Sequence, residues 1–146
     1  MKVARLFFVA ELTACLCLIT SKAAVAYASS LSPENLGPFA VAYHDKRVPL
    51  VAVALFLAMI LAARRFPPLV SYSIAAFAGA GLANTISQFA WPGTPDYIVI
   101  RQIDVIANVA DLVLLACAAI VVIAAAAQLT SRISHAPDHS HVTKRR

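Results

Sequence analysis

The chain has few charged residues. Of its 146 residues only 13% are Asp, Glu, Lys or Arg, whereas 61% are hydrophobic, and the mean hydropathy is +0.79. Soluble domains carry about 25% charged residues. These values therefore exclude an ordinary soluble protein and indicate a membrane protein, and the length allows one compact domain.

Cysteine is also scarce, and the sequence contains no internal repeat. The three cysteines are Cys15, Cys17 and Cys117. Cys15 and Cys17 are two residues apart, so they point to different faces of a helix. We expect all three thiols to act as small apolar side chains, which excludes a fold built on a disulfide framework.

The net charge of +5 does not indicate nucleic-acid binding, because the basic residues stand at the ends of apolar runs. This distribution is typical of membrane proteins. The runs predict four spans at about 6–28, 48–63, 69–91 and 105–129, with a polar basic cytoplasmic tail at 130–146. The second run is slightly short for the roughly 20 residues of a span. We therefore expect an all-α membrane protein, a four-helix transmembrane bundle, with or without a small extracytoplasmic β element.

Topology follows from the distribution of Lys and Arg over the two sides of such a bundle. The side with both termini and the Arg64-Arg65 connector carries eight basic residues, and the opposite side carries four. The eight are Lys2, Arg5, Arg64, Arg65, Arg132, Lys144, Arg145 and Arg146. The positive-inside rule then places both termini in the cytoplasm and the protein in the inner (plasma) membrane.

The first run has two further interpretations. Residues 1–30 resemble a secretory signal peptide, with Ala-x-Ala sites that include Ala26-Tyr27-Ala28, and Leu12-Thr13-Ala14-Cys15 matches a lipobox by its letters. A retained span is favoured, because the run is longer than the 7–15 residues of an ordinary signal-peptide core. Glu11 lies within this run and is assigned no role.

Polar side chains gather between Ala80 and Asp111, in the middle of apolar sequence. Asp104, Asn108 and Asp111 are spaced i, i+4, i+7 and would share one face of the fourth helix. Asn84, Ser87, Gln88 and Trp91 form a similar stripe on the third helix. Neither stripe can face lipid cheaply, so the two should face each other. The turn Pro92-Gly93-Thr94-Pro95 could bring Asp96 over Asp111.

Two carboxylates that lie close together share one proton, so that one can act as a base and the other as an acid. Aspartic peptidases use this arrangement to activate water and to polarise the scissile carbonyl. The alternative is structural: Asp96 and Asp104 would cap helices, and Asp111 would pair with an Asn to fix two helices together.

The same residues resemble the lipoprotein signal peptidase (signal peptidase II) family. Gly79-Ala80-Gly81-Leu82-Ala83-Asn84 resembles its Gly-rich element, Thr94-Pro95-Asp96-Tyr97-Ile98 its first aspartate motif and Ala107-Asn108-Val109-Ala110-Asp111 its second. The resemblance implies that Asp96 and Asp111 are the catalytic dyad, and that Asn84 and Asn108 position the dyad or the substrate. It covers about residues 79–122.

The chain also departs from the family pattern. Ser87-Gln88 stands where the family has Asp-Arg, and Leu18 stands four residues before Lys22, where the family has an aspartate. We therefore expect a divergent aspartic endopeptidase that cleaves the signal peptides of lipid-modified prolipoproteins beside membrane lipids, with no metal or cofactor and no nucleic acid. The alternative is a catalytically degenerate or non-enzymatic membrane protein that binds lipidated peptides or partner helices.

Overall fold

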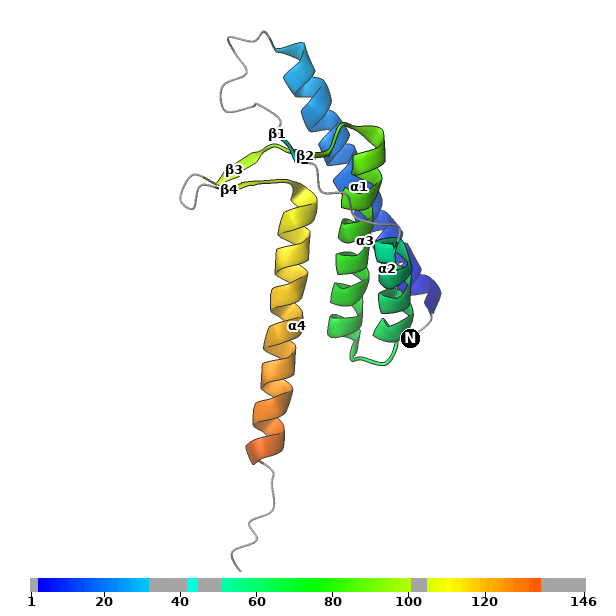
Figure 1. Ribbon diagram of the computed structural model, residues 1–146. Coiled ribbons are helices and arrows are strands. Elements are labelled where there is room, and N and C mark those ends of the chain that lie inside the picture. Colours follow the sequence, from blue (N-terminus) through cyan, green and yellow to red (C-terminus); the bar gives the residue numbers. More distant parts are fainter. Residues whose placement is uncertain (1–2, 32–41, 45–50, 101–104, 135–146) are drawn as a thin grey trace, which may run out of the picture.

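The computed structural model describes residues 3–31, 42–44, 51–100 and 105–134. They form four helices, which are α1 (Val3–Ser30), α2 (Val51–Ala63), α3 (Pro68–Ala90) and α4 (Val109–Ser134). Four short strands lie at one end of the helices (Figure 1): β1 (Ala42–His44), β2 (Thr94–Asp96), β3 (Ile98–Ile100) and β4 (Val105–Ala107). β1 pairs antiparallel with β2, and β3 pairs antiparallel with β4. Asp104 and the histidines of the tail lie outside the described residues.

Three helices in the described part of the chain are long and apolar enough to cross a membrane. They are Val3–Ser30, Pro68–Ala90 and the first 23 residues of α4, Val109–Ser131. α2 is equally apolar but has 13 residues, fewer than the roughly 20 that a span needs. The chain is thus a mostly helical, membrane-embedded protein with three candidate spans, and a fourth span over 48–63 stays a prediction.

α3 lies at the centre of the bundle and packs against α1, α2 and α4. The residues at these contacts are mostly alanine, and the buried set includes Ala10, Ala14, Ala75, Ala78, Ala80, Ala83 and Ala110. Small residues let membrane helices approach closely, which strengthens their van der Waals packing. Gly79 shows how close this approach is, since a Cβ added there would lie 3.0 Å from the Cα of Ala10 on α1.

The connection between α2 and α3 is fixed by one serine. Pro68 occupies the first turn of α3, where the missing N–H costs nothing. The Ser71 hydroxyl lies within hydrogen-bonding distance of two carbonyl oxygens, those of Ala63 at 2.6 Å and Phe66 at 2.8 Å. Ser71 is fully buried. It therefore ties the end of α2 and the connector to the first turn of α3, and donates its single proton to one of the two carbonyls at a time.

The start of α4 differs from the sequence expectation. The predicted helix began at about Val105, but residues 105–107 form β4 and the helix begins at Val109. Val105 and Ile106 are β-branched, which favours an extended strand paired with Ile98–Ile100. The prediction that Asp104, Asn108 and Asp111 share one helical face is therefore wrong, because Asn108 precedes the helix.

The third helix also ends slightly earlier than its apolar run. α3 stops at Ala90, and Trp91 adopts an extended backbone with φ −133° and ψ 167°. The following residues, Thr94–Asp96, pair with Ala42–His44, where Asp96 lies opposite Ala42. The chain thus leaves α3 as a short strand and carries Asp96 back toward the start of α4.

Candidate functional site

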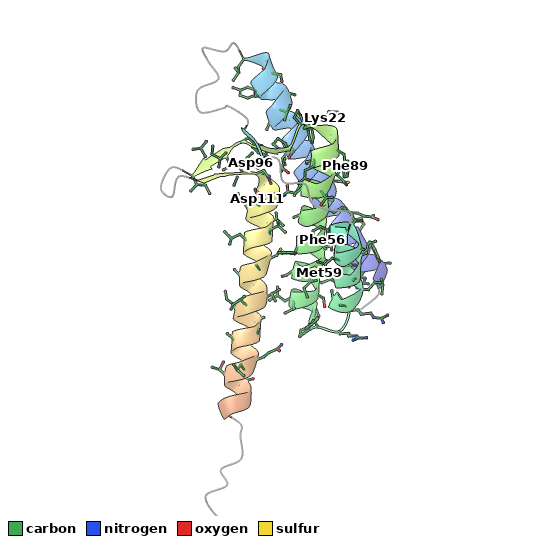
Figure 2. The ribbon with its side chains drawn as sticks, in the orientation of Figure 1. Lys22, Phe56, Met59, Phe89, Asp96 and Asp111 are labelled. Atoms are coloured by element: carbon green, nitrogen blue, oxygen red, sulfur yellow. The ribbon has the colours of Figure 1, made fainter. Side chains whose placement is uncertain are left out.

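The two aspartates lie at the same end of the bundle. Figure 2 shows Asp96 and Asp111 close to the point where the strands end and α4 begins. Asp96 comes from β2 and is only 3% exposed, and Asp111 lies in the first turn of α4 and is partly buried. Two carboxylates therefore lie at one end of the bundle, beside the end of α3 and the start of α4.

Asn108 connects the two aspartates. Its side-chain Nδ2 donates a hydrogen bond of 2.8 Å to Oδ1 of Asp96, and its backbone N–H donates one of 3.2 Å to Oδ2 of Asp111. Asn108 is itself only 1% exposed. A buried amide with partners on both sides fixes the positions of both carboxyl groups relative to each other.

Asn108 and Asp111 also form a reciprocal cap at the start of α4. The backbone N–H of Asp111 donates to Oδ1 of Asn108 at 3.0 Å, while Asp111 accepts the bond from Asn108 described above. The carbonyl of Asn108 accepts the first helical bond, from the N–H of Leu112 at 3.3 Å. This is the geometry of a capping box, with Asn and Asp in place of Ser/Thr and Glu/Gln.

Asn84 on α3 completes the group. Its Nδ2 donates a hydrogen bond of 2.9 Å to Oδ1 of Asp111. Each oxygen of Asp111 therefore accepts one N–H, and the predicted site residues form one chain of hydrogen bonds: Asn84, Asp111, Asn108 and Asp96. The structure brings all four together, although Asn108 and Asp111 meet through a cap and not along one helical face.

The other polar residues of the α3 stripe have different surroundings. Ser87 is buried at 1% exposure, and Nε2 of Gln88 lies 3.4 Å from Oγ1 of Thr94 on β2. These are the two residues at which the resemblance described above would expect Asp-Arg. Gln88 here contacts the strand that carries Asp96, two residues before the aspartate.

Tyr97 is a site residue that the sequence patterns did not identify. Its hydroxyl donates to Oγ1 of Thr20 on α1 at 3.1 Å and accepts from the backbone N–H of Val109 at 3.4 Å. Its own N–H donates to the carbonyl of Ala107 at 3.0 Å. Tyr97 and Thr20 belong to no polar stripe, and their one sequence signal is that Tyr97 follows Asp96.

Two ionisable residues of α1, Lys22 and Glu11, lie in different places relative to the two aspartates. Lys22 is exposed and lies at the same end of the bundle as the aspartates (Figure 2). Glu11 instead lines an otherwise apolar cavity of about 180 Å³ between α1, α2 and α3, together with Phe56 and Leu57. Among the described residues, no three His, Cys, Asp or Glu side chains gather closely enough to hold a metal ion.

Comparison of the chain with models of protein families, with curated proteins and with solved structures finds no match.

Proposed function

We propose that the protein is a membrane aspartic endopeptidase of the signal peptidase II type, which cleaves the signal peptides of lipid-modified prolipoproteins. The observation that carries this proposal is the position of Asn108, hydrogen-bonded to Asp96 on one side and to Asp111 on the other. An aspartic dyad needs two neighbouring carboxyl groups that share one proton, so that one is an acid and the other a base. The Asn108 amide supports this proposal because it bonds to both carboxyl groups.

In this mechanism the carboxyl groups of Asp96 and Asp111 carry one proton between them. The ionised group removes a proton from a water molecule as the water attacks the scissile carbonyl carbon. The protonated group gives its proton to the carbonyl oxygen as charge develops there. The proton taken from the water then passes to the amide nitrogen as the C–N bond breaks, and the other carboxyl group takes back a proton from the intermediate as the C=O bond re-forms. The amides of Asn84 and Asn108 keep the carboxyl oxygens in place during these steps.

The position of the site at the end of apolar helices suits a lipid-anchored substrate. The acyl chains of a prolipoprotein can stay in the bilayer while its peptide reaches the aspartates. In this proposal the bundle has four spans, and both termini lie in the cytoplasm of a cell with the protein in its inner membrane. The aspartates then face outward, where prolipoproteins are processed.

A second candidate is a non-enzymatic or catalytically degenerate membrane protein that binds lipidated peptides or partner helices. The capping box favours it, since satisfying the N–H groups at the start of α4 is sufficient reason for Asn108 and Asp111 to be where they are. Ser87-Gln88 in place of Asp-Arg favours it as well.

The test is cleavage of a diacylglyceryl-modified prolipoprotein by the purified protein in detergent. Asp111→Asn keeps an oxygen acceptor for the helix cap, and Asp96→Asn keeps an acceptor for Asn108, so both variants should fold. We expect each to lose about 10²- to 10⁴-fold in cleavage rate, as for removal of an acid–base group.

Glu11→Gln is the matched control, because it removes a carboxylate from the apolar part of α1 by the same substitution chemistry. It should cleave at the wild-type rate. If folded wild-type protein leaves intact a substrate that a known signal peptidase II accepts, or if either aspartate variant cleaves normally, the non-enzymatic candidate replaces the peptidase.

A further inference from the structure

A groove of about 460 Å³ lies between α2, α3 and α4. This volume lies within the roughly 300–1,000 Å³ of small-molecule sites. Its walls include Met59 and Phe66 on or just after α2, Ile74 and Phe77 on α3, and Cys117 and Val121 on α4. Met59 lies well away from the labelled aspartates (Figure 2), so the groove is separate from the candidate active site.

The groove exists because α4 packs against α3 but not closely against α2. Figure 1 shows α3 between these two helices, with α4 standing apart over most of its length. Only 11% of the most apolar part of α4 is buried inside the protein. In a bilayer the open side of the groove therefore faces hydrocarbon.

The lining favours an acyl chain over a transmembrane helix as the occupant. Helices in membranes associate through small residues and through polar side chains that bond across the interface. Three small residues line the groove as well, but most of its lining is large and apolar, as at Met59, Phe66 and Phe77, and no amide, hydroxyl or charged side chain lines it that could bond to a helix. Met59 has three rotatable side-chain bonds and can adapt to an irregular flexible guest.

One end of the groove lies beside two arginines. Arg64 and Arg65 are exposed and stand between Ala62 and Phe66, both of which line the groove. Within the described ranges, neither arginine forms a salt bridge or a side-chain hydrogen bond. Of the three described acids, Asp96 and Asp111 lie at the opposite end of the helices (Figure 2), and Glu11 lines the separate cavity between α1, α2 and α3. Two exposed guanidinium groups on the connector that borders an apolar groove complement a phosphate joined to a hydrocarbon chain.

We infer that this groove binds an acyl chain of an anionic membrane phospholipid, with the headgroup phosphate at Arg64 and Arg65. The lipid fills the space between α2 and α4. It adds contacts between the largely exposed helix α4 and the rest of the bundle. This inference does not depend on the proposed peptidase activity, since neither the groove nor the arginines belong to the aspartate site.

The experiment is native mass spectrometry of the full chain in detergent, titrated with dioleoyl-phosphatidylglycerol or dioleoyl-phosphatidylcholine. We expect bound phosphatidylglycerol at about tenfold lower lipid concentration than phosphatidylcholine, because each basic residue near an anionic lipid adds attraction. The double variant Arg64→Gln/Arg65→Gln should remove this preference and leave the residual binding of both lipids equal.

A matched pair of variants tests the groove itself. Ala118→Phe places a ring inside the groove, whereas Ala119→Phe places the same ring on an exposed position of α4 outside it. Ala118→Phe should weaken lipid binding at least about tenfold, and Ala119→Phe should not. Ala62→Phe and the exposed Ala58→Phe repeat the comparison from α2, in case the first variant folds poorly.

Three results would overturn the inference. The first is equal binding of the two lipids by the wild type. The second is that both variants of each Phe pair lose lipid affinity equally. The third is that glycerol phosphate displaces the lipid at a concentration similar to that of the lipid itself. The last would mean that the arginines bind a free phosphate and that the groove contributes nothing. A dimer mass that appears as lipid is removed, and that Ala118→Phe abolishes, would assign the groove to a second copy of this chain.

Discussion

Asn108 does more than any other single residue in the described part of the site. Its Oδ1 caps α4, its backbone N–H holds Asp111, and its Nδ2 reaches Asp96. The cap and the bridge use different atoms of one side chain. A substitution can therefore remove the bridge to Asp96 while leaving the cap in place.

Asn108→Ser and Asn108→Ala should separate these two contributions. Serine caps helices about as well as asparagine, so Asn108→Ser should lose only the bond to buried Asp96, roughly 1–3 kcal/mol of unfolding free energy. Asn108→Ala should lose about 1 kcal/mol more, because no acceptor then remains for the N–H of Asp111. The measurement is reversible unfolding in mixed micelles, followed by circular dichroism.

The same pair in an Asp96→Asn background provides the control. The unfolding free energy lost on Asn108→Ser should change in this background, because Asn108 and position 96 are coupled. The difference in unfolding free energy between the Ser and Ala variants should stay the same. Equal stability of the Ser and Ala variants would mean that the asparagine side chain does not stabilise the helix start.

At the scale of whole elements, α3 holds the bundle together through two glycines with different neighbours. Gly79 faces the backbone of Ala10, with the carbonyl carbon 2.9 Å from where a Cβ would stand. Gly81 instead faces the ring of Phe56, whose Cε1 would lie at 2.6 Å. A backbone cannot move without shifting the whole of α1, whereas a ring can turn aside.

We therefore expect Gly79→Ala to destabilise the protein and Gly81→Ala to be much milder. Alanine favours a helix by about 1 kcal/mol over glycine, so propensity alone would stabilise both variants. Overpacking against Ala10 should outweigh this gain at Gly79, with a net loss of about 1–3 kcal/mol in unfolding free energy. Thermal unfolding in detergent compares the two directly, and a Gly79→Ala variant as stable as wild type would mean that α1 and α3 lie further apart.

The elements differ in how far the sequence determines them. Long apolar runs bounded by Pro67 and Pro92 were enough to predict α3 to within about a residue. The start of α4 was not predictable in the same way, because Val105-Ile106-Ala107 is apolar enough for a membrane helix and β-branched enough for a strand. Pairing with Ile98–Ile100, a few residues earlier in the chain, decides the outcome.

The site was partly predictable for a related reason. Asp96, Asp111, Asn84 and Asn108 stand out as polar residues in apolar surroundings, and the structure brings them together. Tyr97 and Thr20 did not stand out, because a tyrosine and a threonine are common in any membrane protein. Their importance arises from a bond between residues distant in the chain, which no local pattern contains.

For the molecule as a whole, the distribution of basic residues predicts which side of the membrane each end occupies. Arg65 and Pro92 are both exposed and flank α3 at opposite ends. Single cysteines placed at these positions, in a chain whose three native cysteines are replaced by serine or alanine, report their side through a membrane-impermeant maleimide.

Pro92→Cys should react in intact cells, and Arg65→Cys should react only after the cells are opened. Prior blocking with a permeant maleimide, which should abolish both signals, is the control for specific labelling. The reverse labelling pattern would mean that the topology is inverted and that the aspartates lie on the cytoplasmic side. Prolipoprotein signal peptides are not removed on that side.

The hydrogen bond between Tyr97 and Thr20 also constrains the order in which the protein can be assembled. Its two ends are 77 residues apart, and the tyrosine hydroxyl also accepts from the first turn of α4. A ribosome therefore delivers α1 to the membrane long before Tyr97, which bonds to Thr20, or Val109, which bonds to Tyr97, has been synthesised. The aspartate site closes only when the last helix arrives, so chains that stop short of α4 contain neither Asp111 nor the contact that joins their first helix to their last.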